Sequence, residues 1–279
     1  MLVDFHKMHG AGNDFVLLDA RNRPGAARVA AVPELVARLA DRHRGVGFDQ
    51  LVLIEADGEP DAVRVRFFNP DGGESGACGN GSRCAAWFVS GGEAGRRLVL
   101  RTAGGMLAAE VLRNGTVSVD MGVPALDWRA VPLAHACDTL ALPLPGSPAA
   151  CSMGNPHATL FDSGLDPERD GPALECDPLF PERANIGFAE RVGADRLRLV
   201  VWERGAGLTL ACGSGACAAA VNAHRLGLCG RRVAVEMPGG ELDLEWREDD
   251  DHVLMAGPVA TAFTGRVSLG LLPGGGNGR

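Results

Sequence analysis

The feature that most constrains the fold is a short motif that occurs twice. The 279-residue chain reads Ala-Cys-Gly-Asn-Gly at residues 77–81 and Ala-Cys-Gly-Ser-Gly at residues 211–215. Cys78 and Cys212 are 134 residues apart, close to half the chain, and each copy opens an alanine-rich segment. Self-similarity of this kind indicates a repeated structural unit. We expect a duplicated domain that presents the same device twice; chance similarity of two Gly- and Ala-rich segments is the alternative.

The rest of the sequence predicts many short strands and few helices. Helices are predicted at Pro33–Arg44, Gly79–Val89 and Gly213–Leu226. Short β-rich or alternating runs predict strands at Val63–Phe68, Leu107–Leu112, Thr116–Met121, Leu197–Glu203, Val233–Met237 and Leu242–Trp246. Proline and glycine predict a loop at Pro143–Pro148 and a disordered tail at Pro273–Arg279. We therefore expect an α+β protein.

Composition excludes several classes of protein. The formal net charge of −8 does not suit a nucleic-acid-binding protein, which needs a basic surface. Lys7 is the only lysine, and a pyridoxal-phosphate enzyme needs a Schiff-base lysine. No apolar run approaches about 18 residues, so we expect no membrane span. The first residues lack the apolar core of a signal peptide, so we expect a cytoplasmic location.

The eight cysteines are then expected to be reduced thiols. Their spacing does not suit zinc, because the sequence has no C-x-x-C pair and no H-x₃-H pair. A free cysteine is usually a small buried hydrophobic residue. We expect this of Cys84 and Cys217 inside predicted helices, and of Cys137, Cys151, Cys176 and Cys229.

Cys78 and Cys212 differ from the other cysteines because each directly precedes a predicted helix. The first N–H groups of a helix lack internal partners and make that end electropositive. A thiol there has a lowered pKa, toward roughly 3.5–7.5, and the glycine-rich turn lets a carboxylate approach the N–H groups. A thiolate could remove a proton from one face of a carbon atom while a thiol returns one to the opposite face. This chemistry inverts a stereocentre without a cofactor.

Eight motifs, in order along essentially the whole chain, resemble those of the diaminopimelate epimerase family. They are Lys7–Phe15 (KMHGAGNDF), Asp41–Gln50 (DRHRGVGFDQ), Phe68–Gly72 (FNPDG), Ala77–Gly81 (ACGNG), Gly154–His157 (GNPH), Glu182–Phe188 (ERANIGF), Glu203–Gly207 (ERGAG) and Ala211–Gly215 (ACGSG). Each motif alone is weak, but all eight in order form a specific signal.

The resemblance implies that LL-diaminopimelate and meso-diaminopimelate are interconverted, for lysine and cell-wall synthesis, by two cysteines without a cofactor. It implies two pseudo-symmetric lobes, each a mixed β-barrel-like sheet around a central helix, with the active site in the cleft between them. The N-terminal lobe is expected at residues 1–121, completed by a strand at 264–272. The C-terminal lobe is expected at 122–263 and the tail at 273–279. The family also implies a homodimer.

By the same resemblance, Cys78 and Cys212 form the acid–base pair, and His157 and Glu203 support proton transfer and substrate ionisation. Without it, His157 would read as a loop histidine and Glu203 as part of a solvated ion pair. The residues expected to contact substrate are Asn13, Gln50, Asn69, Gly79, Asn80, Asn155, Asn185, Arg204, Gly213 and Ser214. Among them, Arg204 can grip the distal carboxylate with two hydrogen bonds.

One position departs from the family pattern. The family often reads R-G-x-G-E-T, whereas this chain has Leu208 at the position of that glutamate. Leu208 is not among the residues to which chemistry is assigned, so activity is still expected. The chain also has no tyrosine, so any contact that relatives make through tyrosine must differ.

The nearest alternative is a proline or hydroxyproline racemase on the same scaffold. Such an enzyme would keep two cysteines but would not need the polar set for a distal amino-acid group, which Glu203, Arg204 and the asparagines supply. A thiol redox or metal protein is disfavoured by the cysteine spacing. A dinucleotide-binding enzyme or a serine hydrolase is disfavoured because the sequence lacks their glycine-rich motifs.

Overall fold

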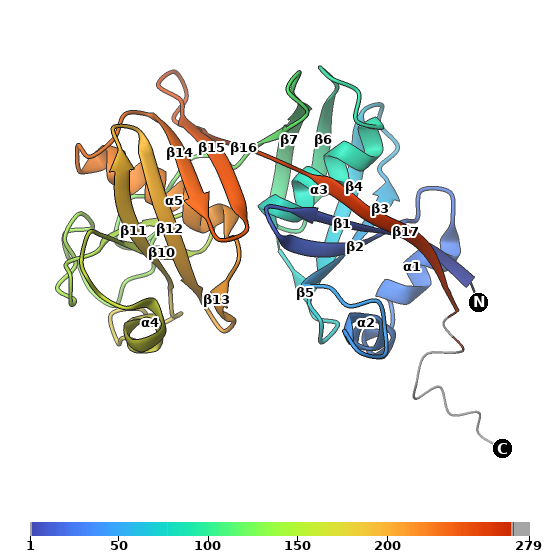
Figure 1. The fold of residues 1–279 in the computed structure, drawn as a ribbon, viewed down its shortest axis with the longest axis horizontal. Helices are drawn as coiled ribbons and strands as arrows, with labels where there is room; N and C mark the ends of the chain where they lie inside the picture. The colour runs from blue at the N-terminus through green and yellow to red at the C-terminus, as the bar shows by residue number, and fades with distance from the viewer. Residues whose placement is uncertain (1, 77, 269, 271–279) are drawn as a thin grey trace. The chain divides into compact units, whose positions relative to one another are not determined.

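The computed structural model describes residues 2–76, 78–268 and 270, and it divides the chain into two compact units (Figure 1). Unit 1 comprises Met1–Val119 and Val259–Arg279, and unit 2 comprises Asp120–Pro258. The chain thus leaves unit 1 once and returns to it near its end. The expected tail at 273–279 and residues 269, 271 and 272 of the expected strand 264–272 lie outside the described residues.

Unit 1 is a mixed sheet with three helices. Its strands are β1 (Leu2–Gly10), β2 (Asn13–Asp19), β3 (Gln50–Ala56), β4 (Ala62–Phe68), β5 (Glu74–Ser75), β6 (Arg97–Thr102), β7 (Gly105–Val111), β8 (Val117–Asp120) and β17 (Ala260–Ser268). Its helices are α1 (Pro24–Ala30), α2 (Pro33–Ala40) and α3 (Gly79–Ser90). Pairing runs β17–β1–β2–β3–β4, then from β4 to both β5 and β6, and on to β7 and β8. The β2–β3 and β4–β6 pairs are parallel, and the others are antiparallel.

Unit 2 repeats this plan with one described strand and one described helix fewer. Its strands are β9 (Ala149–Ser152), β10 (Pro156–Phe161), β11 (Asn185–Gly193), β12 (Arg196–Glu203), β13 (Gly207–Thr209), β14 (Arg232–Met237), β15 (Gly240–Trp246) and β16 (Val253–Gly257). Its helices are α4 (Pro167–Glu175) and α5 (Gly213–Arg225). Pairing runs β9–β10–β11–β12, then from β12 to both β13 and β14, and on to β15 and β16.

Apart from β17, which only unit 1 has among the described strands, the two units therefore match strand for strand. The parallel pairs β10–β11 and β12–β14 correspond to β2–β3 and β4–β6. The helices α1 and α2 follow β2, as α4 follows β10, and α3 and α5 each lie between a short strand and the next long one. This correspondence confirms the duplicated α+β fold expected from the repeated cysteine motif.

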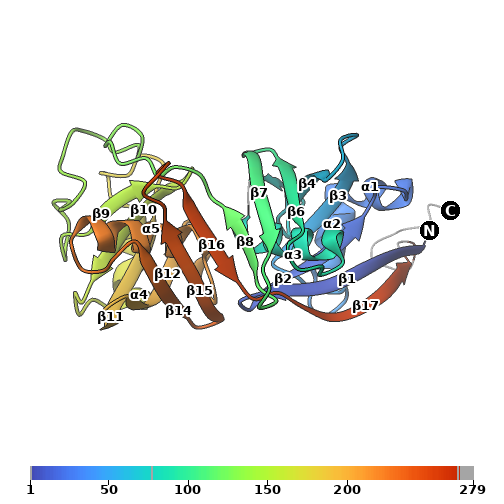
Figure 2. The ribbon, with the colours of Figure 1, turned by 90° about the horizontal axis from the view of Figure 1, so that it is seen from above.

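Each long helix is enclosed by its own sheet (Figures 1 and 2). In unit 1, α3 contacts β1 to β4 as well as β6 and β7; in unit 2, α5 contacts strands from β9 to β16. A helix that is buried all round needs small or apolar side chains on every face. The buried stretch from Ala216 to Val221 meets this need with alanine, cysteine and valine, which explains the alanine-rich composition after each motif.

The strands and helices that the sequence predicts are present, with shifted ends. The largest shift is in α2, which was expected to reach Arg44 and ends at Ala40. Asp41 leaves the helical conformation, and its carboxylate accepts hydrogen bonds from the N–H groups of His43 and Arg44. Aspartate commonly forms such local turns in competition with a helix.

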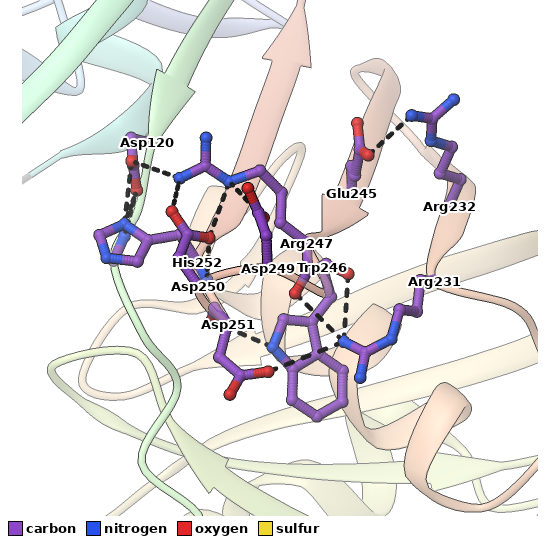
Figure 3. A network of polar contacts seen from close by, with 11 residues as sticks. Asp120, Arg231, Arg232, Glu245, Trp246, Arg247, Asp249, Asp250, Asp251 and His252 are labelled. Carbon is purple, nitrogen blue, oxygen red and sulfur yellow. Dashed lines mark hydrogen bonds and ion pairs between the residues drawn. The ribbon is translucent and has the colours of Figure 1, made fainter.

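A polar network fastens the first residue of unit 2 to the loop after β15 (Figure 3). The carboxylate oxygens of Asp120 lie 2.8 and 2.9 Å from Nδ1 of His252, and Arg247 lies 3.7 Å away. On the same side of unit 2, the Arg231 guanidinium lies over the Trp246 ring, 4.7 Å from its centre.

Among the described helices, none is both long enough and apolar enough to cross a membrane.

Candidate active site

In unit 1, Cys78 is the N-cap residue of α3. Its backbone is extended (φ −151°), and its Sγ accepts a hydrogen bond from the N–H of Gly81 at 3.3 Å. Its carbonyl oxygen accepts from the N–H of Ser82 at 2.8 Å, which closes the first turn of the helix. The sulfur is partly exposed and lies against the electropositive end of a twelve-residue helix.

In unit 2, Cys212 occupies the same position at the start of α5, but it is buried, with 5% of its surface exposed. Burial raises the pKa of the Cys212 thiol well above its usual value, and the nearby Glu203 carboxylate raises it further. The N–H of Gly215 and the hydroxyl of Ser214 lower it, with smaller effect. The expected lowering of this pKa is therefore wrong for Cys212, because burial and a neighbouring charge outweigh the helix end.

The second glycine of each motif is required by packing. A Cβ atom on Gly81 would lie 2.8 Å from Cε1 of Phe67 and 3.4 Å from Sγ of Cys78. A Cβ atom on Gly215 would lie 3.0 Å from Cγ2 of Val201 and 3.2 Å from Sγ of Cys212. Since both helices press against a strand here, an added Cβ atom would clash with Phe67 at Gly81 and would crowd both Val201 and the Cys212 sulfur at Gly215.

The predicted polar residues of unit 1 form two pairs. Asn80, in the first turn of α3, donates to Oδ1 of Asn13 at 3.3 Å and accepts from the buried Arg83 at 2.8 Å. Gln50, at the start of β3, donates to Oδ1 of Asn69 at 2.9 Å. The structure thus brings Asn13 and Asn80 together beside the helix that begins at Cys78.

A charged network holds the Asn13 end of this arrangement. Nδ2 of Asn13 donates to Asp49 at 2.7 Å, and Arg42 bonds both Asp49 and Asp14. Lys7, the only lysine, bonds Asp14 and the carbonyl oxygen of Gly47. Burial acts to raise the pKa of Asp14, but hydrogen bonds from Arg42 and Lys7 outweigh it and hold that pKa well below its usual value. Lys7 is therefore used structurally.

In unit 2, His157 and Asn155 bond each other. Nε2 of His157 lies 2.9 Å from Oδ1 of Asn155, and His157 is 2% exposed. Burial, aided by the positive charge of Arg204, lowers the pKa of His157 to about 3. His157 is therefore neutral near pH 7, and we assign its Nε2 hydrogen to the bond with the amide oxygen.

Glu203 and Arg204 lie in the turn between β12 and β13. The hydroxyl of Thr209 donates to Oε1 of Glu203, and the N–H of Arg204 donates to Oδ1 of Asn185 at 3.0 Å. Asn185 is 4% exposed and also donates to the carbonyl oxygen of Pro156 at 3.1 Å. The exposed guanidinium of Arg204 donates to the carbonyl oxygen of Glu182 at 2.9 Å. His157, Asn185, Glu203 and Cys212 thus lie on adjoining elements of one unit.

The site also contains side chains that the sequence analysis did not single out. These are Asp49 and Arg83 around the asparagine pair, and Glu175, which bonds the turn that carries Glu203. The sequence could have indicated Arg83, because it is a charged residue inside a helix that was expected to be buried. Of the remaining cysteines, Cys84, Cys151, Cys217 and Cys229 are buried as expected, Cys137 is half-buried, and Cys176 is exposed, contrary to expectation.

Other places in the molecule offer less for chemistry. In the part of the chain that the structure describes, no group of three or more His, Cys, Asp or Glu side chains could hold a metal ion. A hollow of about 410 Å³ in unit 2 is lined by Asp195, Gly230, Arg231, Arg232, Glu245, Trp246 and Glu248. This lining includes none of the residues predicted for the site.

Comparisons with known proteins agree on one family. The model of the family Diaminopimelate epimerase matches residues 5–126 and 149–262. The diaminopimelate epimerase of Acidiphilium cryptum is 57% identical over 275 residues, covering 96% of this chain and 97% of that protein. That of Gluconobacter oxydans is 56% identical over 270 residues, covering 96% and 100%.

Solved structures share the fold at low identity. A hydroxyproline epimerase from Agrobacterium vitis has a TM-score of 0.65 at 16% identity, covering 95% of this chain and 91% of that chain. A predicted epimerase from Pseudomonas aeruginosa has a TM-score of 0.67 at 18% identity, covering 95% and 99%. At such identity the likeness shows the fold alone.

We predict that Gly81→Ala destabilises the protein by about 1–3 kcal/mol, because the new methyl group overpacks Phe67. Helix propensity alone would favour alanine by up to about 1 kcal/mol, so a loss identifies the clash. Urea unfolding measures the change. Gly76→Ala is the control, since its Cβ would meet only a backbone nitrogen at 4.0 Å. A Gly81→Ala protein as stable as wild type would contradict this packing argument.

We predict that His157 makes the protein less stable in mild acid. Its pKa is about 3 in the native state and about 6.5 when unfolded, so below pH 6.5 the unfolded state binds a proton that the native state does not. Between pH 7 and 5 the free energy of unfolding should fall by about 2 kcal/mol more in wild type than in His157→Gln. Denaturant unfolding at both pH values measures this, with the exposed His43→Gln as control. Equal falls in wild type and His157→Gln would show that His157 is not held neutral.

Proposed function

The chain belongs to the diaminopimelate epimerase family, so it is an isomerase that epimerises diaminopimelate, and we propose that Cys78 and Cys212 move the proton. The observation that carries this assignment is the equivalence of the two cysteines. Each caps the buried helix of one of two matching units, and each has its sulfur beside a first-turn N–H. Duplication thus supplies two similar sulfur groups, as a two-base reaction requires.

LL-diaminopimelate and meso-diaminopimelate differ in configuration at one α-carbon. Inversion requires that one sulfur removes the hydrogen as a proton while the other delivers a proton to the opposite face. Each sulfur must come within about 3–3.5 Å of that carbon or its proton. The raised pKa of Cys212 favours its thiol form and supports proton delivery by Cys212 when Cys78 is the base. One sulfur must therefore be ionised while the other is protonated.

The helix ends supply the electrostatic stabilisation. Removing an α-proton places negative charge on the adjacent carboxylate, and preorganised N–H donors stabilise such charge. We assign this role to the first-turn groups of α3, at Gly79 and Asn80, and of α5, at Gly213 and Ser214. Glycine in these turns lets the carboxylate come close to the backbone. This chemistry uses no cofactor.

The remaining predicted residues hold the two ends of the substrate. Arg204 presents an exposed guanidinium that suits the distal carboxylate. Asn13, Gln50 and Asn69 in unit 1, with Asn155 and Asn185 in unit 2, offer amides that can bond ammonium and carboxylate groups. Neutral His157 orients Asn155, and Glu203 lies next to the Cys212 thiol as a support for proton transfer.

We predict that purified protein interconverts LL- and meso-diaminopimelate and leaves D- and L-proline unchanged. Cys78→Ala and Cys212→Ala should each lower kcat by about 10²–10⁴-fold, because each removes an acid–base group. A coupled assay of meso-diaminopimelate formation measures both effects. Cys137→Ala is the control, because Cys137 is half-buried and lies between β8 and β9, in a stretch that carries none of the predicted site residues. Full turnover by either site variant would reject the two-thiol assignment, and racemisation of proline would favour the alternative enzyme.

We also propose that the protein acts as a homodimer in the cytoplasm. The family resemblance implies the dimer, and Phe263 on β17 offers an apolar side chain that is 50% exposed. The cysteines are free thiols, as a reducing compartment favours. Light scattering should give twice the mass of one chain; a monomer at micromolar concentration would contradict the dimer. Recovery from a membrane or periplasmic fraction would contradict the location.

A further inference from the structure

Glu175, the last residue of α4, has a carboxylate that is buried yet fully engaged. The residue is 6% exposed. Its Oε2 accepts a hydrogen bond from Nε1 of Trp202 at 2.8 Å, and its Oε1 accepts from the N–H of Gly205 at 2.9 Å. The guanidinium of Arg183 lies 3.6 Å from Oε1. Burying a carboxylate is costly, so its partners indicate a role that a neutral side chain would not fill.

The two donors to Glu175 flank, in the sequence, the residues proposed to act on the substrate. Trp202 and Gly205 lie on either side of Glu203 and Arg204, at the turn from β12 to β13 (Figure 1). The turn is tight: the N–H of Ala206 donates to the carbonyl oxygen of Glu203 at 3.0 Å, and Gly205 has φ +76°. The Glu175 carboxylate therefore clamps this turn from outside.

A second contact fixes the position of α4 relative to β12. Gly171 lies one helical turn before Glu175, on the same face of α4. A Cβ atom on Gly171 would lie 2.7 Å from Cγ of Trp202, so the helix backbone packs directly on the indole. Close packing at Gly171 and hydrogen bonding at Glu175 together fix Trp202 in one orientation.

The chemistry of the partners requires two acceptors. An indole N–H and a backbone N–H can only donate, so both carboxyl oxygens of Glu175 must accept. Glutamine has nearly the same shape, but it has one oxygen and a donor NH₂ group. In Glu175→Gln, a donor would face a donor at either Trp202 or Gly205, and a buried N–H would lose its partner.

We propose that Glu175 is a positioning residue for the epimerase reaction, whose carboxylate holds the Glu203–Arg204 turn in the geometry that binds substrate. This inference rests on the proposed roles of Glu203 and Arg204. Glu203 has a further tie, because Thr209 on β13 bonds its carboxylate. The backbone N–H of Arg204 donates to Asn185, but its exposed guanidinium bonds only the carbonyl oxygen of Glu182. Since Thr209 holds the Glu203 carboxylate directly, the guanidinium of Arg204 depends more on the backbone of the turn than the Glu203 carboxylate does.

The expected result is a rise in KM with little change in kcat. Arg204 binds the distal end of the substrate, so its displacement weakens substrate and transition state alike. In Glu175→Gln, KM for LL-diaminopimelate should rise about tenfold while kcat stays within about threefold of wild type. Glu168→Gln makes the same chemical change at an exposed position of α4, and both constants should stay unchanged. An unchanged KM in Glu175→Gln, or a loss confined to kcat, would overturn the proposal.

Trp202→Phe provides the second arm of a double-mutant cycle. Without the indole N–H, the single amide oxygen of the glutamine side chain introduced by Glu175→Gln can serve Gly205. Glu175→Gln should therefore raise KM by no more than about threefold in the Trp202→Phe background, against about tenfold in wild type. This arm also decides the case if Glu175→Gln alone does not fold. A tenfold rise in both backgrounds would overturn the two-acceptor argument.

The indole N–H resonance of Trp202 in a ¹H–¹⁵N NMR spectrum, assigned with Trp202→Phe, tests the clamp without substrate. In Glu175→Gln, this resonance or that of the Gly205 N–H should shift upfield, because one of the two donors loses its acceptor. Both resonances should stay in place in Glu168→Gln, and two unmoved resonances in Glu175→Gln would overturn the clamp. Wild-type protein that does not epimerise diaminopimelate would instead reject the proposed function, whatever these resonances do.

Discussion

Both units of the protein are built around the same arrangement: a cysteine at the N-terminus of a helix that is enclosed by a sheet. Enclosure removes water from the helix, so its free N–H groups are among the few polar partners near the sulfur. Enclosure by the sheet also requires small side chains, which is why glycine and alanine follow each cysteine in the sequence. Gly81 and Gly215 show how tight this is, since a single methyl group would contact both a strand side chain and the sulfur. The same short motif thus lets the helix pack against its strand and places the cysteine sulfur at the helix N-terminus.

Duplication produced two copies of this arrangement, and their surroundings have diverged. Beside Cys78, the structure places the Asn13–Asn80 amide pair, which is tied to Arg83 and Asp49. Beside Cys212 it places Glu203, which, after burial, raises the pKa of the thiol. These unequal surroundings favour the thiol form at Cys212. In the proposed reaction, Cys212 then delivers a proton when Cys78 removes one, and the two roles reverse in the opposite direction.

The sequence predicted the repeat, the two buried helices and the strands with clear alternation, because these depend on local pattern. It did not predict β1–β3, β5, β6, β9–β11, β13 or β16, nor the helices α1 and α4. In β2, β3, β9 and β10 consecutive residues are buried, so these strands lack the alternation that predicts a strand. It missed Glu175 and Asp49, since a lone acidic residue in sequence reveals neither burial nor partners. It also predicted a low pKa for Cys212, because the helix end can be read from the motif whereas burial and Glu203 cannot.

In the proposed reaction, two different sulfur atoms handle the departing and the arriving hydrogen. Epimerisation of LL-diaminopimelate in deuterium oxide, stopped early and analysed by mass spectrometry and NMR, tests it most directly. Because thiol protons exchange with solvent, the account predicts that the meso product carries deuterium at the inverted carbon while recovered LL substrate remains almost free of it. Product that keeps its original hydrogen would contradict the account, as would recovered substrate labelled as heavily as the product, which would indicate a single base on one face.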